Sequence, residues 1–164
     1  MEYETNITKA KTIADIFDIV KTIVRELIGV DQAGLLVGVS DLGSSNQGFI
    51  GAFYSLDANM IIINKSPLRR IRDTKPQLYN YYLFHIMLHE YLHSIGSFDE
   101  IQTRQMVYEI SRNCFGDEHI ITKLATNMSA FIPNLLHPTE LPQIQESNIE
   151  FIMGIDRSNT NYIN

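Results

Sequence analysis

Two histidines four residues apart, His89 and His93, enclose Glu90 in the pattern H-E-x-x-H. Residues four apart lie on the same face of a helix, so both imidazoles can reach one metal ion. The carboxylate of Glu90 comes one position after the first histidine, where it can reach a metal-bound water rather than the ion itself. The spacing therefore predicts a zinc site with a general base beside it.

A hydrolytic zinc site takes three protein ligands and keeps one position for water, so a third ligand is expected after Gly96. Asp99 lies ten residues after His89, the spacing of the third ligand in the longer H-E-x-x-H-x-x-G-x-x-(His or Asp) pattern. Glu100 follows it and has a longer side chain. Both carboxylates also suit a helix N-terminus. The sequence leaves the third ligand open between Glu100, which we prefer, and Asp99, with Glu109 as a more distant candidate.

The motif can bind a metal ion in this way only if it lies on a helix. The sequence predicts one that starts at Thr74 and Pro76 and stops at Gly96. We expect Gly96 to end this helix as a left-handed cap. A broad stripe of residues along the helix comprises Leu78, Tyr81, Tyr82, His85, Leu88, His89, Leu92 and His93. The helix is therefore expected to be largely buried, with both motif histidines on its later turns and His85 packed near them without binding metal.

A long amphipathic helix is predicted near the N-terminus. Apolar residues recur at helical spacing over residues 7–28, with Asn6 placed to cap the start and Gly29 to stop the end. This pattern is typical of a helix that packs on a sheet.

Three strands are predicted between the two helices. They cover residues 35–39, 49–54 and 60–64. The last two would form a hairpin around the turn at residues 57–59. The strand at 60–64 is either an exposed edge that could pair with an extended substrate or an interior strand. Residues 66–72 are basic and are expected to form a solvated link to the motif helix.

Two further helices are predicted after the motif. A capping box at Ser97–Glu100 would open the first, which would end at Gly116, and the second would cover residues 117–131. The fold class is therefore α+β, with an N-terminal helix, a small three-stranded sheet, the motif helix and the helices that follow it.

Composition argues against several classes of function. The 164 residues carry a formal net charge of −6, which disfavours general nucleic-acid binding because that requires a positive face. No apolar run reaches membrane-spanning length, and the polar, acidic start of the chain is unlike a secretory signal. The lone Cys114 excludes an internal disulfide and is expected to pack in a core. These features predict a cytoplasmic protein that binds neither nucleic acid nor membranes.

The segment His89-Glu90-x-x-His93-x-x-Gly96, followed closely by acidic residues, resembles the motif of the zincin metallopeptidases. The predicted order of elements is similar to that of their compact gluzincin branch, in particular the minigluzincins. Those proteins have a helix, a three-stranded sheet, a helix that bears the histidines, and a following helix that supplies a glutamate. The resemblance covers residues 7–131, and the motif is its specific part.

The resemblance implies zinc-dependent hydrolysis of peptide bonds, with His89, His93 and Glu100 as ligands and Glu90 as the general base. A ligand at Asp99 would instead fit the metzincin pattern. A metzincin also has a turn that contains a methionine, and the sequence around residue 128 matches that turn poorly.

We therefore predict a cytoplasmic zinc metallopeptidase that hydrolyses peptide or protein substrates through a metal-bound water activated by Glu90. The alternative is a zincin-like regulatory or binding module with a structural or absent metal and no protease activity. The presence of Glu90 favours the enzyme, because a structural site has no use for a base there. The oligomeric state is left open.

An oxyanion formed during hydrolysis would need a donor besides the metal. His119, Tyr108 and Tyr54 are the candidates that the sequence offers.

Residues 1–131 are expected to form a single zincin-like catalytic domain, and residues 132–164 a C-terminal extension that could dock over it. Within the extension, residues 149–155 have the pattern of a short docked strand or turn. Compact peptidases that this chain resembles can be latent, with a terminal segment across the cleft. Removal of the residues from 134 onward is thus predicted either to raise activity or to destabilise the domain.

Overall fold

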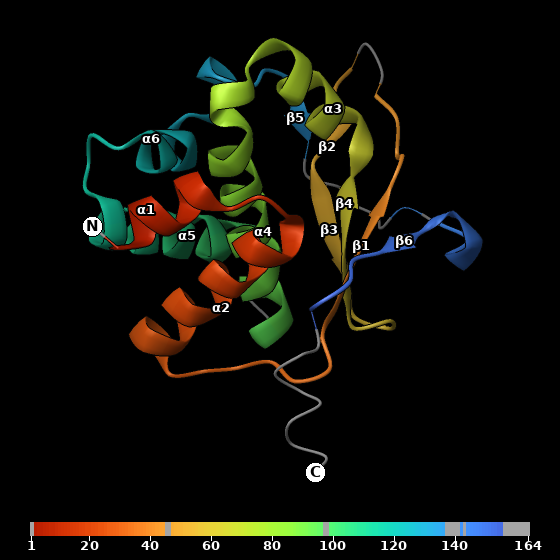
Figure 1. Ribbon diagram of the computed structural model, residues 1–164, viewed down its shortest axis with the longest axis horizontal. Helices are drawn as coiled ribbons and strands as arrows, with labels where there is room; N and C mark the ends of the chain where they lie inside the picture. The colour runs from red at the N-terminus through yellow and green to blue at the C-terminus, as the bar shows by residue number, and fades with distance from the viewer. Residues whose placement is uncertain (1, 45–46, 97–98, 137–141, 143, 156–164) are drawn as a thin grey trace.

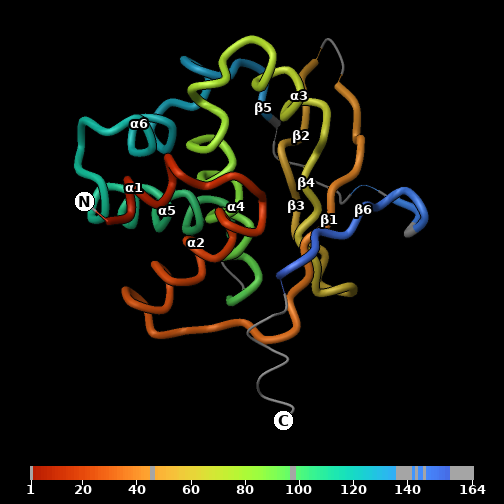
Figure 2. The backbone as a smooth tube through the Cα atoms, viewed as in Figure 1, coloured from red at the N-terminus to blue at the C-terminus, as the bar shows by residue number. Residues whose placement is uncertain are grey.

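The computed structural model describes residues 2–44, 47–96, 99–136, 142 and 144–155. Most of the helices gather on one side of a small sheet, and one short helix, residues 65–74, lies at the upper end of its strands (Figure 1, Figure 2). Within these ranges the chain forms six α-helices and a mixed four-stranded sheet, which confirms the predicted α+β class. The prediction of three strands is wrong, because residues 150–151 add a fourth strand beside residues 36–40. Among the described residues, no helix combines the length and apolar character that crossing a membrane requires.

The main sheet has the strand order β3-β4-β1-β6. Its strands are β1 (Leu36–Ser40), β3 (Ala52–Ser55), β4 (Met60–Asn64) and β6 (Glu150–Phe151). The predicted hairpin is confirmed, since β3 pairs antiparallel with β4, and β1 lies parallel to β4 on the other side. β4 is therefore interior, and the alternative that it forms an exposed edge is wrong. All 5 of its residues are buried, because both faces of the sheet are covered.

The predicted second strand is interrupted at Gly51. Its first half, β2 (Phe49–Ile50), pairs in parallel with β5 (Leu135–Leu136), whereas its second half continues as β3. A Cβ atom at Gly51 would lie 2.9 Å from the Tyr82 hydroxyl oxygen and 3.0 Å from Leu135 Cδ1. The close approach of this strand to the motif helix favours glycine. The break was not predicted because the spacing of apolar residues within the strand does not reveal a contact with a distant part of the chain.

The N-terminal region forms two helices rather than one. Their bounds are Glu2–Lys9 for α1 and Ile13–Ile28 for α2. Thr12 opens α2 with a capping box: its hydroxyl accepts a hydrogen bond from the Asp15 N–H, and the Asp15 carboxylate accepts one from the Thr12 N–H. This local signal outweighs the continuous apolar spacing, so the predicted cap at Asn6 is wrong. Gly29 ends α2 in the left-handed region, at φ 79°, and the predicted stop is confirmed.

The motif helix starts later than predicted. The remaining helices are α3 (Lys65–Thr74), α4 (Tyr79–Ile95), α5 (Glu100–Phe115) and α6 (Ile120–Thr126), with 3-10 turns at Pro76–Leu78, Met128–Ala130 and Glu146–Asn148. Residues 66–72 lie in α3 rather than in a solvated link, because Leu68 and Ile71 are buried in the main core. Pro76 opens the turn that leads into α4. The motif helix α4 packs against α2, β3, α5 and α6.

The helix ends around the motif also differ from the prediction. Gly96 ends α4 in an extended conformation, at φ −164°, and not as a left-handed cap. Asp99 is the N-cap of α5, so that helix begins at Glu100. The predicted cap, Ser97, lies outside the described residues. The third predicted helix is shortened to α6 because Asn127 leaves the helical conformation, with φ −152°.

Two hydrophobic clusters cover the two faces of the sheet. The main core lies between the sheet and the helices and contains Cys114, as predicted. The smaller cluster consists of Phe53, Met60 and Ile62, with the C-terminal residues Ile144 and Ile149 packed against it. Successive β4 residues alternate between the clusters, so the smaller one covers the face opposite the helices. The described part of the C-terminal segment therefore completes the cover of the sheet.

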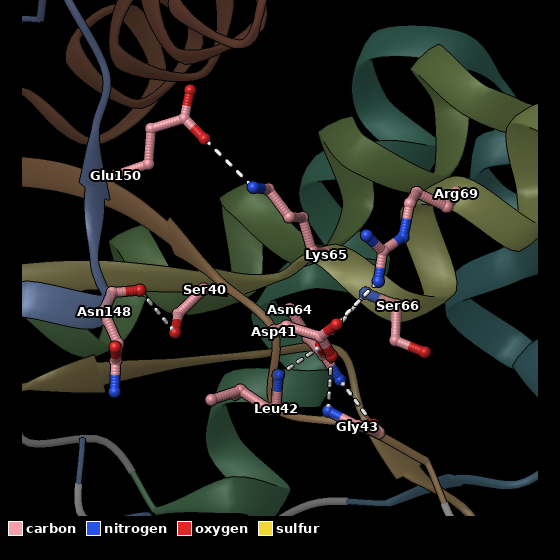
Figure 3. A network of polar contacts seen from close by, with 10 residues as sticks. All are labelled: Ser40, Asp41, Leu42, Gly43, Asn64, Lys65, Ser66, Arg69, Asn148 and Glu150. Carbon is pink, nitrogen blue, oxygen red and sulfur yellow. Dashed lines mark hydrogen bonds and ion pairs between the residues drawn. The ribbon is translucent and has the colours of Figure 1, made fainter. Parts of the chain in front are cut away.

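Polar contacts fix both the C-terminal segment and the loops near it (Figure 3). The Ser40 hydroxyl donates to the Asn148 carbonyl oxygen at 3.0 Å, and Lys65 pairs with Glu150 at 3.1 Å. β6 then pairs antiparallel with β1, which confirms the predicted docking of residues 149–155 as a short strand.

Asn64, at the end of β4, is the buried centre of this network (Figure 3). Its side-chain oxygen accepts hydrogen bonds from the N–H groups of Leu42 and Ser66, at 2.9 and 3.1 Å. Its amide nitrogen donates to the Ile50 carbonyl oxygen at 2.7 Å. Asn64 thus caps α3 and holds the chain just before Gly51, where the strand approaches α4.

Substitution of Gly38 tests the docking of the C-terminal segment. A Cβ atom at this position would lie 2.5 Å from Ile149 Cγ2. We expect Gly38→Ala to lower the free energy of unfolding of the full chain by about 1–3 kcal/mol, measured with denaturant. The same substitution should cost less in a chain that ends at residue 141, which lacks Ile149. Equal costs in the two chains would contradict this packing.

Candidate metal centre

Three side chains meet where α4 ends and α5 begins. His89 and His93 lie one helical turn apart on α4, and Glu100 is the first residue of α5. The two histidine Nε2 atoms are 3.3 Å apart. The Glu100 carboxylate oxygens lie 2.8 Å from His93 Nε2 and 3.2 Å from His89 Nε2. Ligand atoms of all three residues fall within 4.8 Å of one another, so this group can hold a metal ion.

The neighbouring acidic residues have other contacts. The Asp99 carboxylate accepts a hydrogen bond from the Gln102 N–H at 2.7 Å and so caps α5. Its side chain is exposed and lies outside the three-residue group. Glu109 accepts a hydrogen bond from the Gln105 side chain one turn away, at 2.9 Å. Of the three acidic candidates, the structure brings Glu100 to the histidines.

Glu90 is buried beside this group, with an exposed fraction of 8%. Burial is the main cause that raises the pKa of Glu90 well above its usual value, and the negative charge of Glu100 adds to it. The backbone N–H of Tyr54 donates a hydrogen bond to Glu90 and opposes the rise. A carboxylate with a raised pKa is a stronger base than an exposed glutamate, which suits it to accept a proton.

Two cavities meet at His85 and His89. The smaller, of about 20 Å³, lies between α4 and the start of β3 and is also lined by Gly51 and Glu90. The larger, of about 270 Å³, extends along α5 and α6 and is also lined by Arg104. His85 lines both cavities but is outside the group of possible ligands. Both cavities therefore border the candidate metal centre at His89.

Two of the three side chains predicted as oxyanion donors, those of His119 and Tyr54, make contacts elsewhere. His119 Nε2 bonds to the Glu4 carboxylate, and the His119 ring packs against Phe115. The Tyr54 hydroxyl donates to the Asn59 side chain at 2.8 Å, so Tyr54 contributes its backbone N–H to the site. Tyr108 is outside the described lining of both cavities. The structure does not bring these three side chains to the metal-binding group.

Arg104 borders the site and was missed by sequence reasoning. It lies four residues after Glu100 on α5, so the two share a helix face. Its Nε atom is 3.9 Å from a Glu100 carboxylate oxygen. The four-residue spacing of Glu100 and Arg104 can be read from the sequence. It places Arg104 beside the site only once Glu100 is known to face the histidines.

Comparison of the chain with protein-family models, curated proteins and solved structures finds no match. The fold and the site together define an α+β protein with a candidate metal centre of two imidazoles and one carboxylate. Any more specific assignment rests on the chemistry of these residues.

Metal binding should distinguish Glu100 from Asp99. With Zn²⁺ as the probe, Glu100→Gln should weaken binding at least about 100-fold, because changes in outer-shell partners alone cost about 10–100-fold. Asp99→Asn keeps a good N-cap and should leave the affinity unchanged. Competition with a chelator measures the zinc affinity of both variants. Each variant replaces one carboxylate by the amide of the same length. The opposite pattern would assign the third ligand to Asp99.

Proposed function

We propose that this protein is a zinc metallopeptidase of the zincin type, most similar to the compact gluzincins. The observation that carries the proposal is the meeting of Glu100 with His89 and His93, with Glu90 buried beside them. Hydrolysis needs a base next to the metal, whereas a structural metal site does not. The order of elements, with two helices and strands β1 to β4 before α3 and the motif helix, is consistent with the same class.

The donor set fits zinc. A tetrahedral zinc ion with bonds of about 2.0–2.1 Å places its ligand atoms about 3.3 Å apart. The three closest separations among the donors here are 3.3, 3.2 and 2.8 Å. Two imidazoles and one carboxylate also leave the fourth position for water, as in catalytic zinc sites.

The proposed reaction is the addition of water to a peptide carbonyl. Zinc, when bound, would polarise the water and the carbonyl oxygen. Glu90 accepts the proton from the water as it attacks and then passes this proton to the leaving amine. The Tyr54 N–H holds the Glu90 carboxylate from the β3 side. The hydrogen bond fixes the orientation of the base without removing its capacity to bind a proton.

An extended substrate would pair with β3 rather than β4. Within the described sheet, β3 is an outer strand, with β4 on one side of it. Ala52, its first residue, lines the small cavity together with His89 and Glu90. Peptides add to such sheet edges through main-chain hydrogen bonds, so a substrate on β3 would pass close to the base.

Peptide cleavage tests the proposed function. The zinc-loaded full chain should hydrolyse an unfolded protein such as casein, measured by the release of new amino termini. Glu90→Gln should lower kcat about 10²–10⁴-fold, because it removes the proton acceptor while both histidines and Glu100 remain. Glu109→Gln, an equivalent change at an exposed position of α5, is the matched control and should retain activity.

Two results would contradict the peptidase. One is equal cleavage by the native chain and the Glu90→Gln variant. The other is a zinc content of less than about one ion per chain that does not change in His93→Ala, since a catalytic site needs that ligand. Either result would favour a regulatory or binding module that has the same fold.

A further inference from the structure

The larger cavity is lined by a charged side chain, that of Arg104, which the metal centre does not explain. Its volume is about 270 Å³, and it is bounded by apolar side chains such as Val107, Leu124 and Met128. A cavity of about 150 Å³ can hold a benzene ring, so this one has room for an amino-acid side chain. Apart from the two histidines, Arg104 is the one ionisable side chain among the described residues that line it.

Arg104 reaches the cavity from the helix face that it shares with Glu100. Its Nε atom lies 3.9 Å from the Glu100 carboxylate, which is beyond hydrogen-bond distance, and its side chain is 56% exposed. The guanidinium group has five N–H donors in a planar fork, so it can bind both oxygens of another carboxylate. Exposed pairs at such a distance contribute little to stability. The contact with Glu100 therefore does not explain why an arginine stands at position 104.

We propose that Arg104 binds a carboxylate of the substrate, so that the protein prefers peptides with an acidic side chain or a free C-terminal carboxylate near the scissile bond. This inference rests on the proposed peptidase function and names its substrate class. The chain as a whole has a net charge of −6 and repels anions at long range. A carboxylate would therefore need local cations, and Arg104 supplies one besides the metal, in the cavity that His89 also lines.

The inference is tested by measuring peptide binding to a variant that should not cleave peptides, so that the result does not depend on catalysis. The probe is a series of acetylated tetraalanine amides in which glutamate replaces each alanine in turn. A matched series carries glutamine instead, and a third peptide has four alanines and a free C-terminal carboxylate. Calorimetry measures their affinity for the zinc-loaded full chain with Glu90→Gln, before and after Arg104→Gln. Arg112→Gln is the control, because Arg112 is an exposed α5 residue that pairs with Asp117 at 2.9 Å.

We expect Arg104→Gln to weaken the best carboxylate peptide about tenfold, the loss of one charge-assisted bidentate contact. The glutamine peptides should change less than about twofold, and Arg112→Gln should change neither series. Stronger binding of the glutamate amides identifies a side-chain carboxylate as the ligand, and stronger binding of the free-acid peptide identifies the C-terminus. Both outcomes support the inference.

Equal losses for the carboxylate and glutamine peptides, or no loss at all, would overturn the inference. A fall in zinc content in Arg104→Gln would also overturn it, because Arg104 would then act by positioning Glu100. If the native chain cleaves no peptide but the Arg104-dependent preference persists, the peptidase proposal fails and the carboxylate site stands. If it cleaves glutamate and glutamine peptides equally well, with or without Arg104, the peptidase stands and the carboxylate site fails.

Discussion

His89, His93 and Glu100 come from two helices and can meet only if each helix keeps its orientation, and burial fixes the orientation of α4. The helix packs against α2, β3, α5 and α6, and its buried residues lie on every side of it. Any rotation would expose apolar side chains that are now out of water, which is costly. His89 and Glu90 are part of this buried surface, with exposed fractions of 4% and 8%. The orientation of His89 and of Glu90 is thus set by the packing of the whole domain.

The position of Glu100 has a more local cause. Asp99 binds the N–H of Gln102 and so determines where α5 starts. The next residue is then placed in the first turn, within reach of both imidazoles. The sequence could not separate Asp99 from Glu100, because capping preference and helix-dipole arguments favour both. By contrast, the geometry of the two histidines follows from their spacing alone, and this part of the site was predictable.

Predictions of the fold succeeded where local patterns were sufficient and failed where distant contacts decided. The hairpin of β3 and β4 and the stop at Gly29 depend on a few neighbouring residues. The break at Gly51 depends on Tyr82 and Leu135, which are far away in the sequence. The interior place of β4 likewise depends on its pairing with β1, which lies more than 20 residues away in the sequence, and the burial of its second face depends on Ile144 and Ile149. The C-terminal segment thus stabilises the sheet that stands beside the motif helix.

The burial of Glu90 is the feature that favours the proposed reactive centre over a structural metal site. A buried carboxylate loses hydration, and one backbone hydrogen bond from Tyr54 offsets part of that loss. In a purely structural site, an apolar residue of similar size at this position would often be neutral or stabilising. The neighbouring positions on α4, from Ile86 to Leu88 and again at Tyr91 and Leu92, follow that rule. A carboxylate that departs from this rule beside three side chains that could hold a metal ion lowers stability at that position, as residues of functional sites commonly do, and this supports the proposed function.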